Sequence, residues 1–207
     1  MSRITKKAVI VVIGGVLLVC LYNAVMCCIG RVITIGITNQ PDQKIMSEIL
    51  SCLIGESTGT SIEIIDFKDH EKCIEAALNG EINIYIDYYS DGLRKIEYKN
   101  PEVNPRRIYS IVKQGYKKEF DLVWLKPFGY IMPSDRGQEF PNMAAAVVRK
   151  DTLNKFPLLG RLINKLNNKI LNESLEELLK KATNGINKDM AFQFLKNNNL
   201  LPEWKIS

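Results

Sequence analysis

The sequence predicts an α/β fold in which helices cover both faces of a mostly parallel β-sheet, following an N-terminal transmembrane helix. Two observations lead to this prediction. Residues 31–86 alternate strand-like runs of β-branched side chains with helix-like runs, and the connections between them are short. Residues 8–29 are almost wholly apolar, and about 20 such residues suffice to cross a bilayer as a helix.

The composition is that of a folded chain with no marked affinity for nucleic acid. Of the 207 residues, 46% are apolar and 25% are charged, which is enough to build a packed core. The net charge is +5, and Arg3, Lys6 and Lys7 supply three of these units, which leaves +2 for the rest. Because the positive and negative charges nearly balance, there is no electrostatic argument for a nucleic-acid partner.

The N-terminal apolar run is predicted to be a single-pass membrane anchor. Lys6 and Lys7 precede it, and positive charge tends to stay on the cytoplasmic side. We therefore expect a cytoplasmic stub at residues 1–7, an anchor at 8–30 and an extracytoplasmic domain at 31–207, which places the bulk of the chain outside the cell membrane.

The N-terminal apolar run has two alternative interpretations, a cleaved signal peptide and a lipid anchor. A cleaved signal peptide usually has a shorter apolar region that ends in small residues, and no Ala-x-Ala site occurs here. A lipid anchor on Cys20 or Cys27 needs a small preceding residue, whereas Val19 and Met26 stand there. The uncleaved anchor is the favoured reading of the three.

The region after the anchor begins as a strand–helix–strand–helix–strand series. Pro41 suits a first helical turn, and Gly59 breaks the helical pattern that follows it. Asp69 can cap a second helix, which Gly80 ends. The series implies a parallel sheet with right-handed crossovers. The predicted strands are residues 31–36, 61–65 and 82–86, and the helices between them start at Pro41 and Asp69.

The remainder of the chain is predicted to add two strands and several helices. A helix at 105–118 leads to a strand at 121–125, and a loop rich in Pro and Gly precedes a last strand at 143–148. The C-terminal part reads as helical. An apolar stripe runs through Leu158, Leu159, Leu162, Ile163 and Leu166, and Ser174 with Glu177 reads as a capping box.

Motifs of enzyme chemistry are missing from the sequence. It has no phosphate-binding glycine motif and no nucleophile elbow. His70 is the one histidine and reads as a solvated surface residue, which argues against a histidine-based triad. Cys52 and Cys73 are either a disulfide or, as we favour, two buried thiols. No cofactor, metal site or enzymatic activity is predicted.

The segment from Tyr85 to Leu93 is the most informative stretch. It places three tyrosines and an aspartate at the carboxyl end of the third strand, where ligands of such sheets bind. Tyrosine rings attract quaternary ammonium groups by cation–π forces. The local alternative is that Tyr85 belongs to the core and that Tyr88 and Tyr89 are ordinary loop aromatics.

The order of motifs then points to a family. The chain resembles the substrate-binding proteins of glycine betaine, choline and other osmoprotectant ABC importers over about residues 32–201. The family's Leu-Val-Trp-Leu-x-Pro-x-Gly-Phe and its Tyr-Pro-Glu-Tyr-Thr-Gly-Thr-Gly-Leu loop have counterparts in this chain. The matching stretches are residues 37–43, 75–83, 85–93, 122–130 and 144–153.

The resemblance implies a periplasmic-binding-protein-like lobe that binds a quaternary ammonium compound and serves an ABC transporter permease. The implied ligand-binding residues are Tyr88, Tyr89, Tyr130, Asn39 and Asp91. Members of this family close two lobes around the ligand. A homodimer is therefore a further implied arrangement, because two copies of the chain could together enclose a ligand.

The chain also departs from the family pattern. The second lobe of the family has no counterpart between residues 130 and 143. Tyr89 and Asp91 stand where the family has threonines, and Asn142 stands where it has a tyrosine. The alternative function is therefore a one-lobe relative that no longer captures solute and acts as an accessory or protein-interaction module at the membrane.

Overall fold

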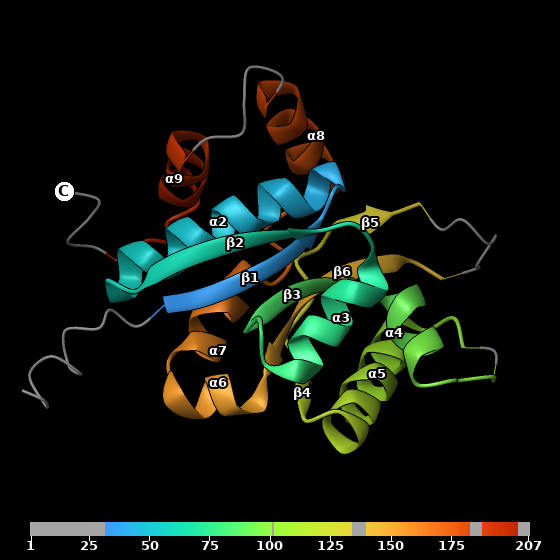
Figure 1. The fold of residues 1–207 in the computed structure, drawn as a ribbon. Helices are drawn as coiled ribbons and strands as arrows, with labels where there is room; N and C mark the ends of the chain where they lie inside the picture. The colour runs from blue at the N-terminus through green and yellow to red at the C-terminus, as the bar shows by residue number, and fades with distance from the viewer. Residues whose placement is uncertain (1–31, 101, 134–139, 183–187, 203–207) are drawn as a thin grey trace, which may run out of the picture. The chain divides into compact units, whose positions relative to one another are not determined.

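The computed structural model describes residues 32–100, 102–133, 140–182 and 188–202 (Figure 1). The expected cytoplasmic stub at 1–7 and anchor at 8–30 lie outside the described residues, so both stay predictions. Within the described ranges no helix is long and apolar enough to cross a membrane.

The strands of the domain form one mixed sheet in the order β2–β1–β3–β6–β4, and β5 pairs with β6 off this path. β1 is parallel to β2 and to β3, whereas β6 is antiparallel to β3, β4 and β5. The bounds are β1 Val32–Thr38, β2 Ser61–Phe67, β3 Ile84–Tyr88, β4 Leu122–Trp124, β5 Ile131–Met132 and β6 Asn142–Arg149.

The strand β6 modifies the expected parallel sheet. β1, β2, β3 and β4 all run in one direction, as predicted, but β6 lies between β3 and β4 and runs in the opposite one. A parallel pair needs a long crossover, usually a helix, to bring the chain back to the same edge. No helix lies between β4 and β6 in the part of the chain that the structure describes, so β6 returns antiparallel.

Helices cover both faces of this sheet, as the sequence predicted. α2 packs against α7, α8 and α9 on one face, whereas α3, α4 and α5 belong to the other (Figure 1). The bounds are α2 Pro41–Thr58, α3 His70–Asn79, α4 Tyr89–Lys95, α5 Pro105–Glu119, α6 Lys150–Lys155, α7 Leu159–Ile163, α8 Asn172–Lys181 and α9 Lys188–Asn197, with a 3-10 turn at Asn164–Leu166.

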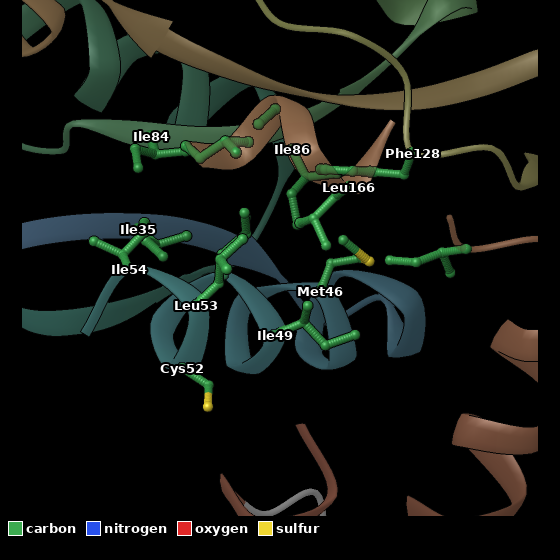
Figure 2. Packing of buried hydrophobic residues seen from close by; sticks show 14 of the residues in the cluster. Ile35, Met46, Ile49, Cys52, Leu53, Ile54, Ile84, Ile86, Phe128 and Leu166 are labelled. Carbon is green, nitrogen blue, oxygen red and sulfur yellow. The ribbon is translucent and has the colours of Figure 1, made fainter. Parts of the chain in front are cut away.

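Two core clusters correspond to the two faces. Side chains of α2 such as Met46 and Leu53 are fully buried and point toward Ile84 and Ile86 of β3 (Figure 2). The other cluster contains Trp124 and the buried residues of α3 and α5. Because side chains alternate along a strand, β3 contributes to both clusters.

The signals at the ends of the first two helices are confirmed. Pro41 occupies the first turn of α2, and Gly59 ends it with a φ of 68°. The Asp69 side chain accepts a hydrogen bond from the backbone of Lys72 at 2.8 Å and caps α3, which Gly80 ends with a φ of 86°. Positive φ is cheap for glycine, which explains both endings.

The C-terminal helices differ from the prediction. α8 begins at Asn172, so Ser174 lies inside the helix instead of capping it. The side chain of Asn172 binds Ile131 through both the N–H and the C=O of that residue, each at 2.9 Å. This tertiary contact fixes the start of α8. Leu158, expected in an apolar stripe, is 62% exposed.

The two described cysteines lie in different core clusters. Cys52 belongs to the α2 face and Cys73 to the α3 face, and both are buried thiols. The prediction that Cys52 and Cys73 are two buried thiols is confirmed. Burial, with the charge of Asp87, raises the pKa of the Cys73 thiol to about 12.

Candidate functional site

A cleft of about 1480 Å³ opens beyond the carboxyl ends of β1 and β3. Ligands of such sheets bind at this edge, which is where the segment after β3 was expected to lie. Three groups of residues that follow β1, β2 and β3, or end these strands, line the cleft. They are Thr38, Asn39, Gln40 and Gln43, then Lys68, Asp69 and His70, then Tyr88, Ser90 and Asp91.

Three of the five proposed ligand contacts line this cleft, and two do not. Asn39, Asp91 and Tyr88 contribute to its wall. Tyr89 is 1% exposed, and its ring lies 6.0 Å from that of Trp124 in the core. Tyr130 is wholly buried. A ligand could touch these two rings only if the core opened.

The alternation of side chains explains the different positions of the neighbouring tyrosines. Tyr88 ends β3 on the α2 side of the sheet, and Tyr89 begins α4 on the opposite side. Tyr130 stacks on Phe128, with 6.2 Å between ring centroids and an interplanar angle of 7°. Of the three tyrosines, only Tyr88 therefore meets both the core and the cleft.

A buried carboxylate holds the hydroxyl of Tyr88. The Tyr88 hydroxyl donates to Asp42 Oδ2 at 2.6 Å, and the Tyr130 hydroxyl donates to the same oxygen at 3.0 Å. Asp42 is 2% exposed, and its Oδ1 accepts no hydrogen bond from the described residues. Burial and then the charge of Asp42 raise the pKa of both phenols, so both stay protonated donors.

Gln43 ties this group to the end of β1. Its side-chain oxygen accepts from the backbone N–H of Thr38 at 2.7 Å and from the Thr38 hydroxyl at 3.0 Å. Its side-chain nitrogen donates to the Tyr88 hydroxyl at 3.2 Å. Such charge-assisted and networked bonds fix the orientation of the Tyr88 ring at the cleft.

Asp42 and Gln43 were not recognised as site residues from the sequence. An acidic residue in the first turn of a helix is common, because it complements the helix dipole. The tyrosines that bind Asp42 lie 46 and 88 residues further along the chain. No local pattern announces such a meeting.

A second polar group lies on the α3 side of β3. Asp87 is fully buried, and its Oδ1 lies 3.0 Å from Nε2 of His70. The backbone N–H of Tyr88 donates to Oδ1 at 2.8 Å, and the Tyr116 hydroxyl donates to Oδ2 at 2.9 Å. Both oxygens of the buried carboxylate therefore have a hydrogen-bond partner.

His70 is not the solvated residue that the sequence suggested. Its side chain is 18% exposed, because the start of α3 sits against the end of β3 and brings the ring to Asp87. Burial lowers the pKa of His70, but the charge and hydrogen bond of Asp87 outweigh it, so that the pKa is raised overall.

The charges around the cleft favour a cation. Four carboxylates, three basic side chains and His70 line it, and two further carboxylates, Asp42 and Asp87, are buried within hydrogen-bond distance of Tyr88. Arg94 and Asp91 partly neutralise each other, because Arg94 Nη2 lies 2.8 Å from Asp91 Oδ1. The lining carboxylates are Asp69, Asp91, Glu97 and Glu102, and the lining bases are Lys68, Arg94 and Lys99.

The sequence of the first part of the chain matches a known protein family. Residues 31–131 match a family model described as the substrate-binding domain of ABC-type glycine betaine transport systems. This family is called OpuAC, and residues 31–131 are OpuAC-like. The resemblance inferred from the motifs is thereby confirmed.

Known relatives agree with the OpuAC-like assignment. The carnitine transport binding protein OpuCC of Listeria monocytogenes is 28% identical over 133 residues, which are 61% of this chain. The chain spans only 38% of the length of that relative.

Solved structures share the fold. A glycine betaine/carnitine/choline ABC transporter structure matches with a TM-score of 0.72 at 17% identity, and covers 81% of this chain and 99% of its own. Apo YehZ from Escherichia coli matches with a TM-score of 0.68 at 12% identity, with the same two coverages. At such identities the likeness shows the fold alone.

The OpuAC-like segment contains most of the cleft. The lining residues from Thr38 to Val103 fall within residues 31–131, whereas Met132, Pro133, Phe140 and Asn142 line the cleft from beyond that segment. Asn142 accepts a hydrogen bond from the backbone of Ser90 at 2.9 Å and so fixes the turn after Tyr88. The matched segment and β6 together define the shape of the site.

Proposed function

We propose that this chain captures a quaternary ammonium compound of the glycine betaine or carnitine type in the cleft beyond β1 and β3. The observation that carries the proposal is Tyr88, which lines the cleft while its hydroxyl donates to the buried carboxylate of Asp42. A ring held in this way presents a constant surface to the ligand.

Electrostatics supports a cationic ligand. A cation near a tyrosine ring gains up to about 2 kcal/mol or more once water is excluded. A carboxylate that accepts the phenolic hydrogen shifts electron density into the ring and adds its own negative field. Tyr98 and Phe140, which also line the cleft, are the further aromatic side chains that could contact the ligand.

We propose that capture takes place on the extracytoplasmic side of the membrane. The apolar run at residues 8–30 would tether the domain to the membrane, with residues 31–207 on the extracytoplasmic side. There it would hand its ligand to the permease of an ABC importer. A second copy of the chain could close the open side of the cleft.

Isothermal titration tests the proposal. The full-length chain, kept in mild detergent because of its apolar run, is titrated with glycine betaine, carnitine and choline. Tyr88→Phe keeps the ring and should keep most of the binding. Tyr88→Leu removes the ring and should weaken binding by about tenfold or more, as the loss of a desolvated cation–π contact requires.

A matched control separates the ring from general damage. Tyr109 lies on α5 and does not line the cleft, so Tyr109→Leu should leave binding unchanged. Circular dichroism checks that each variant is folded. No heat with any of the three ligands up to millimolar concentration would refute capture by this chain and would favour the accessory or interaction role.

A further inference from the structure

A cluster of metal-ligating side chains lies in the wall of the cleft. Among the described residues, His70, Asp87 and Asp91 each place a ring nitrogen or carboxylate oxygen within 4.8 Å of the other two. They come from α3, β3 and α4, so the fold brings them together from separate elements. The cysteine and histidine spacing in the sequence gave no sign of such a site.

The donor set suits a first-row divalent ion. A neutral imidazole is a good ligand for Zn²⁺ and its neighbours in the periodic table, and two carboxylates supply the charge that a dication needs. We propose that His70, Asp87 and Asp91 bind a divalent transition-metal ion such as Zn²⁺, with water from the cleft completing its coordination.

Asp87 is the fixed member of this site. It is fully buried, and the Tyr116 hydroxyl and the Tyr88 backbone N–H hold its two oxygens at 2.9 and 2.8 Å. Hydrogen bonds behind a ligand of this kind orient it toward the metal and raise affinity. The carboxylate already faces His70, whose Nε2 lies 3.0 Å from Oδ1.

The other two ligands can be reached from the cleft. His70 and Asp91 both line the cleft, so an ion and its water can reach them. Zinc bonds of about 2.0–2.2 Å put neighbouring ligand atoms roughly 3.3 Å apart. The present His70–Asp87 distance of 3.0 Å is close to that value.

Arg94 competes with the ion for Asp91. Its Nη2 lies 2.8 Å from Asp91 Oδ1, and both side chains are partly exposed. An exposed ion pair contributes little to stability and can be released. Removing the arginine should therefore help the metal, which a merely structural role of the cluster would not predict.

Metal titration of the full-length chain in mild detergent tests the site. The protein is stripped with EDTA, dialysed and titrated with ZnCl₂ in a calorimeter. One ion should bind per chain, and His70→Asn or Asp91→Asn should each weaken binding by about tenfold or more. Arg94→Gln should tighten it severalfold. Glu97→Gln, which alters another cleft carboxylate, should leave it unchanged.

Cobalt supplies an independent readout. Co²⁺ bound at this site should show ligand-field absorption without thiolate charge-transfer bands, because none of the three ligands is a cysteine. All variants keep the five cysteines of the chain, so a change in affinity cannot come from them.

Several outcomes would overturn the assignment. The first is no binding at millimolar Zn²⁺. The second is that the His70 and Asp91 variants bind Zn²⁺ as tightly as the unmodified chain. The third is a cobalt spectrum dominated by thiolate bands. His70→Asn and Asp91→Asn alter residues at the cleft surface and are expected to fold, so the test does not depend on replacing the buried Asp87.

Discussion

Replacing Tyr130 by phenylalanine tests the hydrogen bond that the Tyr130 hydroxyl donates to the buried carboxylate of Asp42. The change removes one hydroxyl, and the ring stays stacked on Phe128. Asp42 then loses one of the two hydroxyls that donate to its buried Oδ2. A hydrogen bond to a charged group contributes about 1.5–3 kcal/mol. We therefore expect the free energy of unfolding to fall by about 2 kcal/mol.

Urea denaturation and thermal melting measure this loss. For a chain of this size a loss of about 2 kcal/mol lowers the melting temperature by roughly 4–8 °C. Tyr109→Phe is the matched control, because its half-buried ring lies under Lys113, 5.3 Å from the ammonium nitrogen. The control should change the free energy of unfolding by less than about 0.5 kcal/mol.

The double variant tests whether one carboxylate links the two tyrosines. Tyr88→Phe together with Tyr130→Phe leaves Asp42 buried with neither phenolic donor, so the combined loss should exceed the sum of the single losses. If Tyr130→Phe unfolds like the unmodified chain, or if the two losses simply add, the role given to Asp42 is wrong.

Three further predictions concern the α3 side of the sheet. With EDTA present, the His70–Asp87 pair should make its full contribution to stability below pH 6.5, the ordinary pKa of histidine. This contribution should disappear as the pH rises through the raised pKa that His70 has in the folded state. In urea titrations at several pH values, His70→Asn should make the free energy of unfolding less dependent on pH. Gly36→Ala should cost about 1–3 kcal/mol in the same assay, because its Cβ would lie 2.8 Å from Cys73 Sγ and overlap Ile82. The Cys73 thiol, whose pKa burial raises to about 12, should react with a thiol reagent only on unfolding, and rapid labelling of Cys73 itself in the native protein, located by peptide mapping among the five cysteines, would contradict its burial.

Local signals in the sequence predicted the framework of the domain well. Pro41 and Gly59 bound α2, and Asp69 and Gly80 bound α3, because each acts through backbone geometry within a few residues. Helices on both faces follow from the same alternation. Ser174 misled, because the contact of a neighbouring side chain with β5 sets the start of α8.

The site was less predictable than the framework. Its edge of the sheet follows from topology, and Tyr88 lines the cleft there. Strand alternation could have assigned Tyr89 to the opposite face. By contrast, Asp42 acquires its role from partners far along the chain, and His70 from Asp87, so neither could be read from neighbouring residues.

Sharing one carboxylate between a cleft residue and a core residue limits how the site can be redesigned. Tyr88 lines the cleft, while its hydroxyl and that of Tyr130 donate to Asp42 in the interior. A substitution chosen to change ligand preference at Tyr88 therefore also changes folding. Grafting this site onto another scaffold would require moving the first turn of α2 and the Tyr130 segment as one block.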